Sequence, residues 1–181
     1  LELLQNSNQI QLPGTYEGYK LPKSNGSERN RANMKKALKS FNDAGFKVVE
    51  GKLQDNQGRQ FKFSILLRQG AKEYLSIVEM YSSALQRLGI DVQIELVDSS
   101  QYWERIKTLE FDMAPYARDL SLSPGNEQHL YWSSEYADVE GTRNLMGLKS
   151  PTMDKLLDKI MKSKSMKELQ SITRAMDRIL M

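Results

Sequence analysis

The side chains with the greatest potential for chemistry in this chain gather in residues 116–149, a stretch without helical or strand periodicity. It contains aromatic rings, two arginines and the only histidine of the chain: Tyr116, Arg118, His129, Tyr131, Trp132, Tyr136 and Arg143. Long aperiodic segments in compact domains are usually functional or disordered, and aromatic residues argue against disorder. We therefore expect this stretch to carry the functional surface.

No catalytic motif is recognisable in the sequence. A glycine-rich phosphate loop, a nucleophile elbow and an HExxH helix are all absent, and there is no cysteine. A serine–histidine–aspartate triad can be drawn from His129 and any of many serines and aspartates, so the combination carries no weight. We predict no catalytic residue, no metal site and no cofactor. The alternative to a chain without catalytic activity is an enzyme, namely an α/β hydrolase or transferase domain with its site in residues 116–149.

The basic residues are scattered along the chain. The net charge is only +3, from 26 basic and 23 acidic residues. A nucleic-acid-binding protein usually concentrates basic charge on one face and interleaves it with aromatic residues. The lysines near residues 35–39 and 159–167 are instead typical of solvated helix faces. We predict that nucleic acid is not a partner.

Helices and strands are predicted to alternate before residue 116. Two helices are expected at residues 34–44 and 72–88, ended by Gly45 and Gly89 in the left-handed conformation. Asn30 or Ser27 is expected to cap the first helix. The second helix is expected to face the core with five residues: Leu75, Val78, Tyr81, Leu85 and Leu88.

A strand, a helix and a second strand are predicted from residue 90 to residue 114. Ile90, Val92, Ile94 and Leu96 alternate with polar residues, which is typical of a strand with one covered face. Asp98 and Gln101 resemble a capping box for the helix that follows. The strand at 111–114 is expected to stop at Pro115.

Two further helices are predicted at the end of the chain. Pro151 fits the first position of one helix, and Ser165 with Glu168 fits a capping box for the other. Residues 1–30 are polar and rich in Asn, Gly and Pro, so we expect an extended connector there. Residues 31–181 are expected to form an α/β ligand-binding lobe, with a mixed β-sheet flanked by helices. The chain begins without methionine and its last helix is apolar to the end, so we expect it to be part of a longer protein.

The order of short motifs resembles the family 5 extracellular solute-binding proteins of ABC importers, the oligopeptide- and dipeptide-binding type. The matching residues are AGF at 44–46, LGI at 88–90, Tyr102 with Arg105, FDM at 111–113, and RN at 143–144. The similarity covers nearly everything from Met34 onward. Residues 121–157 are most similar to the branch of oligopeptide and microcin C uptake receptors.

This resemblance implies one lobe of a bilobed periplasmic-binding-protein type II fold, which closes on its ligand about a hinge. It implies a periplasmic receptor that captures oligopeptides or peptide-like compounds, holds them through backbone hydrogen bonds and delivers them to a membrane permease. The other lobe would then be a partner of this one. We expect this chain alone to bind ligand weakly or not at all.

The resemblance also suggests ligand-binding residues. Family members carry W-x-x-D after the FDM motif and place the aspartate against the α-ammonium of a peptide, a charge-assisted contact. This chain has Tyr116 and Asp119 at these positions, with Arg118 beside the carboxylate. Asp119 is therefore a candidate ligand anchor, and a local ion pair with Arg118 is the alternative.

Four more residues are candidates for the binding site. Tyr131 and Trp132 either line the cleft or pin the loop to the core. Arg143 and Asn144 either meet a carboxylate or phosphate of the ligand, which a guanidinium fork suits, or brace the loop through backbone hydrogen bonds.

Overall fold

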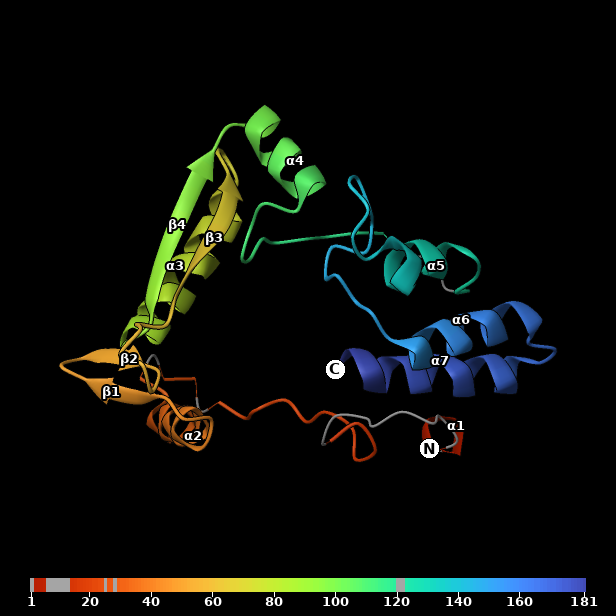
Figure 1. Cartoon of the computed structure of the whole chain (residues 1–181), viewed down its shortest axis with the longest axis horizontal. Coiled ribbons are helices and arrows are strands. Elements are labelled where there is room, and N and C mark those ends of the chain that lie inside the picture. The colour runs from red at the N-terminus through yellow and green to blue at the C-terminus, as the bar shows by residue number, and fades with distance from the viewer. Residues whose placement is uncertain (1, 6–13, 25, 28, 120–122) are drawn as a thin grey trace. The chain divides into compact units, whose positions relative to one another are not determined.

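The computed structural model describes residues 2–5, 14–24, 26–27, 29–119 and 123–181 (Figure 1). Two compact units are present. One consists of Leu1–Leu21, Lys107–Leu109 and Arg118–Met181, and we call it the helical unit. The other consists of Pro22–Ile106 and Glu110–Ala117, and we call it the sheet unit. Each unit has its own hydrophobic core.

The sheet unit is built on strands of both directions. Strands β1 (Lys47–Val49) and β2 (Lys52–Gln54) form an antiparallel pair. Strands β3 (Lys62–Arg68) and β4 (Asp91–Val97) form a parallel pair, with Ile65 opposite Ile94. The α/β class expected from the sequence is confirmed, and the mixed strand directions are divided between two small sheets.

Three helices accompany these strands: α2 (Arg31–Asp43), α3 (Lys72–Gln86) and α4 (Ser99–Thr108). Helix α3 is the crossover that a parallel pair requires, and it packs against β3 and β4 (Figure 1). The core between them consists of Leu53, Ile65, Leu67, Val78, Leu88, Ile90 and Val92. The phenylalanines at 41, 46 and 61 pack edge to face beside this core, with ring centroids 5.4–6.1 Å apart.

The motif residues after β4 act as braces of the sheet unit. Asp112 accepts a hydrogen bond from the backbone N–H of Ser64 at 2.8 Å, and Met113 forms a parallel bridge with Ile65. Arg105 forms an ion pair with Glu95 and donates to the backbone carbonyl of Glu110 at 2.9 Å. These contacts hold the segment that leads from α4 to Pro115 along the edge of the parallel pair.

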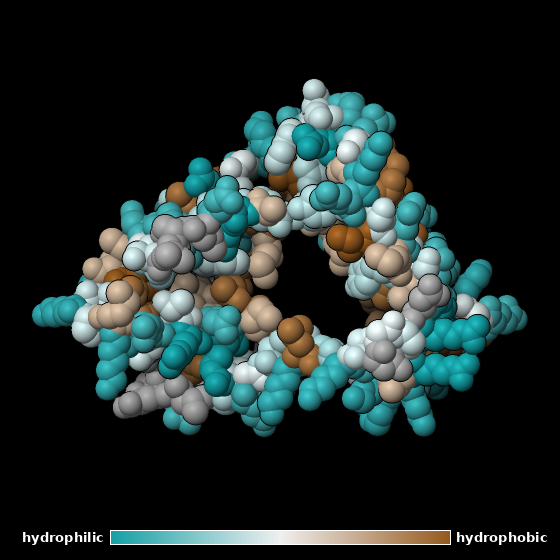
Figure 2. Space-filling view, turned by 180° about the vertical axis from the view of Figure 1, so that it is seen from behind, coloured by the Kyte–Doolittle hydropathy of each residue, from teal (hydrophilic) through white to brown (hydrophobic). Residues whose placement is uncertain are grey.

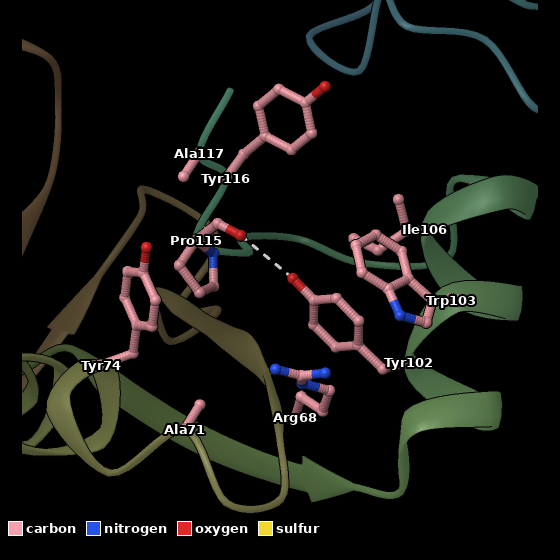
Figure 3. A pocket seen from close by; sticks show the side chains of 9 residues that line it. All are labelled: Arg68, Ala71, Tyr74, Tyr102, Trp103, Ile106, Pro115, Tyr116 and Ala117. Carbon is pink, nitrogen blue, oxygen red and sulfur yellow. Dashed lines mark hydrogen bonds between the residues drawn. The ribbon is translucent and has the colours of Figure 1, made fainter. Parts of the chain in front are cut away.

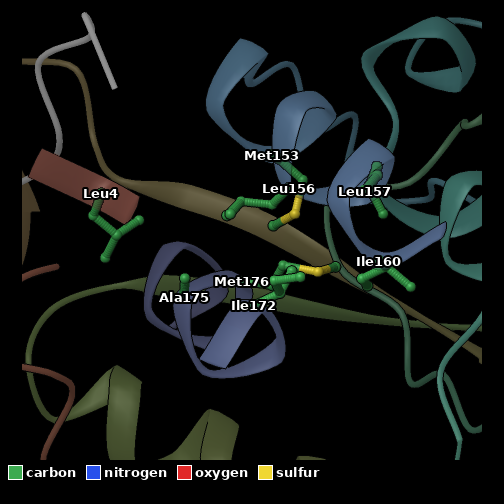
Figure 4. Packing of buried hydrophobic residues seen from close by; sticks show 8 residues of the cluster. All are labelled: Leu4, Met153, Leu156, Leu157, Ile160, Ile172, Ala175 and Met176. Atoms are coloured by element: carbon green, nitrogen blue, oxygen red, sulfur yellow. The ribbon is translucent and has the colours of Figure 1, made fainter. Parts of the chain in front are cut away.

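The helical unit contains α1 (Glu2–Gln5), α5 (Glu127–Trp132), the 3₁₀ helix η1 (Ser134–Tyr136), α6 (Pro151–Lys162) and α7 (Met166–Leu180). Helices α6 and α7 pack side by side and share a core with Leu4 (Figure 4). The α6 and α7 side chains of this core are Met153, Leu156, Leu157, Ile160, Ile172, Ala175 and Met176. Pro151 is at the start of α6 as predicted, and the Ser165 hydroxyl accepts from the backbone N–H of Glu168 at 3.2 Å.

Three local predictions need correction. Asn30 does not cap α2 through its side chain, because its backbone is left-handed with φ 33°, and Ser27 bonds Asn30 itself instead of a helix N–H. Tyr81 is 45% exposed, since the buried stripe of α3 runs through Val78 and Ser82. Glu168 completes no reciprocal box with Ser165, because its carboxylate accepts from the backbone N–H of Lys164.

The expected boundary at residue 30 stays a prediction.

Hydrophilic side chains cover most of the face shown in Figure 2, with hydrophobic residues scattered between them. Within the described parts of the chain, none of the helices combines the length and apolar character needed to cross a bilayer.

Candidate functional site

The sheet unit contains a pocket of about 230 Å³ at the carboxyl ends of its parallel strands. Open α/β sheets usually bind ligands outside this edge, because the loops that follow the strands meet there. Side chains from the end of β3, from α3, from α4 and from the segment after Met113 surround it (Figure 3). The lining residues are Arg68, Ala71, Tyr74, Tyr102, Trp103, Ile106, Pro115, Tyr116 and Ala117.

Tyr102 fixes one wall of this pocket. Its hydroxyl donates a hydrogen bond to the backbone carbonyl of Pro115 at 3.0 Å, which ties α4 to the segment that carries Tyr116 (Figure 3). Its ring packs edge to face against Trp103, with the centroids 5.2 Å apart. Burial raises the pKa of the Tyr102 hydroxyl above its ordinary value of 10.0, so this donor stays protonated at neutral pH.

The lining of the pocket is aromatic and apolar apart from one guanidinium. Arg68 is the last residue of β3, and its side chain is one of those that line the pocket (Figure 3). Among the described residues, no carboxylate lines the pocket. The arrangement suits an apolar or aromatic group of a ligand, with Arg68 able to donate to a carbonyl or an anion.

Tyr116 is the predicted site residue that the structure places in this pocket, where its side chain is half exposed. Sequence reasoning missed Arg68, Tyr74 and Trp103. Arg68 carried a usable signal, because it directly follows the apolar run FKFSILL at 61–67, which is typical of a strand. Tyr74 and Trp103 carried none, since both look like ordinary members of amphipathic helices.

Four other predicted residues come together in the helical unit, in what we call the arginine–aromatic cluster: Arg118, Tyr131, Trp132 and Arg143. The guanidinium carbon of Arg118 lies 4.0 Å from the Tyr131 ring centroid and 4.5 Å from that of Trp132. The guanidinium carbon of Arg143 lies 5.8 Å from the Tyr131 centroid, and its Nη1 donates to the Tyr131 hydroxyl at 3.4 Å. Both arginines therefore share one ring.

Helix α5 positions the aromatic residues of the cluster. Tyr131 is buried, and Trp132 is half-buried with its indole N–H donating to Gln128 Oε1 at 3.0 Å. Trp132 also packs against the core of α6 and α7. Trp132 thus anchors α5 to this core, and both rings present a surface to the guanidinium groups.

Asn144 and Asp119 differ in their surroundings. Asn144 is fully buried, and its amide donates to the carbonyls of Ser133 and Leu148 while its oxygen accepts from the N–H of Leu148. Asn144 thus braces the loop through backbone hydrogen bonds, which is one of the two alternatives given for it in the sequence analysis. Asp119 is exposed and, among the described residues, forms no ion pair with Arg118, whose guanidinium lies on the two rings.

His129 lies half-buried in α5. Within the described ranges, no cluster of three or more His, Cys, Asp or Glu side chains could hold a metal ion. Nothing here favours the hydrolase or transferase alternative.

Comparison with known proteins gives consistent matches. Residues 4–138 match the bacterial extracellular solute-binding proteins, family 5 middle. A putative binding protein of Brucella melitensis is 37% identical over 159 residues, which cover 88% of this chain and 26% of that protein. In Agrobacterium fabrum, the peptidoglycan-binding protein YepA is 32% identical and the probable peptide-binding protein YejA is 30% identical, over 93% and 100% of this chain. The chain spans 27% of YepA and 30% of YejA.

Solved structures show the same fold. The oligopeptide-binding protein AppA of Bacillus subtilis, in complex with a nonapeptide, superposes with a TM-score of 0.69 at 23% identity over 80% of this chain and 28% of AppA. The periplasmic binding protein MelB of Agrobacterium fabrum, in complex with stachyose, gives a TM-score of 0.64 at 19% identity over 81% of this chain and 24% of MelB. The fold is thus that of type II periplasmic binding proteins. The chain belongs to the family 5 bacterial extracellular solute-binding proteins.

Proposed function

We propose that this chain is part of the substrate-binding component of an ABC importer, which captures oligopeptides or peptide-like compounds in the periplasm and delivers them to a membrane permease. The observation that carries the proposal is the aromatic pocket at the carboxyl ends of β3 and β4, in a chain of this family. The similarity to a probable peptide-binding protein supports the choice of peptide. The receptor binds and releases its cargo without chemical conversion.

The pocket would take an apolar or aromatic side chain of the cargo. Tyr74, Trp103 and Tyr116 supply rings for stacking, and the open side of the pocket leaves room for side chains of different sizes. Asp119 is exposed, so its carboxylate is available to accept hydrogen bonds from an α-ammonium group. Asn144 would act indirectly, by holding the loop that carries Arg143.

The proposal is tested by titrating the isotope-labelled chain with a tripeptide such as Ala-Phe-Ala and, separately, with an oligosaccharide. The second ligand matters because MelB was solved with stachyose. We expect the peptide to shift the backbone amide signals of Ala71, Tyr116 and Ala117 and the indole signal of Trp103. Shifts caused by the oligosaccharide and not by the peptide would contradict the assignment of peptide cargo.

A further inference from the structure

The connection between α6 and α7 concentrates positive charge at one end of this helix pair (Figure 1). Residues 159–167, which we call the basic turn, contain four lysines and no acidic residue: Lys159, Lys162, Lys164 and Lys167. All four side chains are exposed. The basic turn therefore has a formal charge of +4, whereas the whole chain has only +3.

Two large apolar side chains are exposed in the same turn. Met161 is 53% exposed and Met166 is 63% exposed, whereas Met153 and Met176 of the same two helices are buried in their shared core. Apolar side chains flanked by lysines are typical of protein surfaces that rest on a membrane. The apolar groups enter the boundary between headgroups and acyl chains, and the lysines are attracted by anionic lipids.

Hydrogen bonds fix the backbone of the basic turn. The backbone N–H and the hydroxyl of Ser163 both donate to the carbonyl of Ile160, at 3.2 and 2.9 Å. The Ser165 hydroxyl accepts from the N–H of Glu168 at 3.2 Å, and the Glu168 carboxylate accepts from the N–H of Lys164 at 2.9 Å. The exposed lysines and methionines thus extend from a defined scaffold.

A hollow of about 380 Å³ lies beside the basic turn and is lined by both helices: Lys159, Ser165, Lys167, Glu168, Ser171 and Ile172. The ammonium groups of Lys159 and Lys167 and the hydroxyl of Ser165 can donate hydrogen bonds to a phosphate group. Glu168 opposes an anion there, although its carboxylate already accepts from the N–H of Lys164. The hollow has room for the phosphate of a lipid headgroup.

The other lysine-rich helix of the chain differs from the basic turn in its apolar side chains. Lys35 and Lys36 of α2 are exposed, and Lys39 pairs with Asp43. The apolar residues of α2 pack against the core of the sheet unit instead of facing solvent: Met34, Ala37, Leu38 and Phe41. Lysines are thus common on this chain, and their combination with exposed methionines distinguishes the basic turn from α2.

We propose that the basic turn docks this chain on a bilayer that contains anionic phospholipids. Met161 and Met166 enter the headgroup boundary, and the four lysines lie among the lipid phosphates. The contact is peripheral, because only the tip of the helix pair takes part. The inference goes beyond the proposed function, since it concerns the surface on which the protein rests and does not depend on its cargo. For a receptor that supplies a permease, such docking would raise its concentration beside the membrane.

Vesicle flotation with the whole chain tests the proposal. The vesicles consist of phosphatidylcholine alone or with about one third phosphatidylglycerol, the anionic lipid. We expect binding to the anionic vesicles only, and weaker binding as salt rises from about 0.1 M to about 1 M, because the screening length falls from about 10 Å to about 3 Å. Soluble glycerophosphoglycerol, which has the headgroup chemistry without the bilayer, should not compete.

Paired variants separate the contributions of charge and of the apolar side chains. Lys162→Gln with Lys164→Gln should weaken binding about 25-fold, because each lysine near an anionic surface contributes about fivefold. Met161→Ser with Met166→Ser keeps the charge and should weaken binding about tenfold, since less apolar surface enters the bilayer.

The matched controls are Lys35→Gln with Lys36→Gln in α2, and Met80→Ser, which changes an exposed methionine of α3. Both should bind as the wild type does, and circular dichroism checks that every variant keeps its helices.

Equal binding to neutral and anionic vesicles would overturn the inference, as would complete competition by glycerophosphoglycerol. Wild-type affinity in the methionine variant, or an equal loss in the α2 control, would reduce the effect to general charge attraction and would also overturn it. Self-association that the methionine variant abolishes, without any vesicle binding, would assign the basic turn to a second copy of the chain instead.

Discussion

The carboxylate of Asp112 accepts hydrogen bonds from the backbone N–H of Ser64 at 2.8 Å and from its hydroxyl at 3.3 Å. The next residue, Met113, accepts from the backbone N–H of Leu66 at 2.8 Å. The Asp112 side chain thus accepts a hydrogen bond from β3 just before the backbone of Met113 begins to pair with this strand. The FDM motif is therefore a brace that holds Pro115 and Tyr116 at the end of the sheet.

Replacing Asp112 should loosen this edge. We expect Asp112→Ala to lower the free energy of unfolding by about 1 kcal/mol, because the Ser64 N–H loses its acceptor at a partly solvated position. Urea denaturation followed by circular dichroism measures the change. Glu79→Ala, which removes an exposed carboxylate from α3, is the matched control and should change stability little. A loss no larger than that of the control would refute the role of Asp112 as a brace.

Gly89 is required by close backbone approach as well as by its φ of 84°. A Cβ at this position would lie 2.6 Å from the backbone nitrogen of Leu53 and 2.8 Å from the carbonyl oxygen of Gly51. We expect Gly89→Ala to lower the free energy of unfolding by about 2 kcal/mol or more. The backbone near Leu53 and Gly51 would have to move, and alanine would be strained at this positive φ. Gly58→Ala has a similar φ of 77° and open space, so it should cost about 1 kcal/mol. Equal losses in thermal unfolding would show that the approach to Leu53 is unimportant.

The Glu95–Arg105 pair should make stability depend on pH. The hydrogen bond from Arg105 holds the pKa of Glu95 below its ordinary value of 4.5. The folded state therefore favours the ionised form. Its stabilising contribution is present above pH 4.5 and is lost as the pH falls through the folded-state pKa.

The pH dependence is measured by urea denaturation between pH 3 and pH 7. We expect Glu95→Gln to be less stable than the wild type at pH 7, with a smaller loss of stability on acidification. Glu79→Gln should follow the wild-type curve. Parallel curves for the wild type and Glu95→Gln would show that the ion pair contributes nothing to the acid sensitivity.

Asn144 should matter more for stability than for ligand contact. Its buried amide makes three hydrogen bonds to backbone groups, so Asn144→Ala should cost about 3 kcal/mol. Asn144→Asp should cost at least as much, because it turns a donor that faces two carbonyls into an acceptor. Thermal unfolding distinguishes this role from direct binding, which predicts near-native stability together with weaker ligand affinity.

The elements that follow local rules could be predicted from the sequence. Gly45 and Gly89 adopt positive φ where the helices were expected to end, and Pro151 begins α6 behind the Ser150 cap. The prediction of buried residues failed where packing between elements decides which side chains are covered. Tyr81 is exposed because α3 covers only a narrow pair of strands, so one turn of its apolar surface has nothing to cover in this unit.

The candidate site was predictable to the extent that it lies in one stretch of sequence. The segment that follows Pro115 was singled out by its aromatic residues, and Arg118, Tyr131, Trp132 and Arg143 do lie together. The pocket beside Tyr116 was not predicted as a set. Arg68 and Trp103 are 35 positions apart and meet only because β3 and β4 are parallel and end at the same edge.

The most direct test of the account is the peptide affinity of Tyr116→Ala compared with Tyr81→Ala. Both variants remove a half-exposed tyrosine from the sheet unit, and only Tyr116 lines the pocket. Dissociation constants come from the resonance titration with Ala-Phe-Ala. We predict about tenfold weaker binding for Tyr116→Ala, the loss typical of a stacked ring, and wild-type affinity for Tyr81→Ala. Wild-type affinity in both variants, or equal losses in both, would contradict the claim that the segment after Pro115 forms a wall of the ligand site.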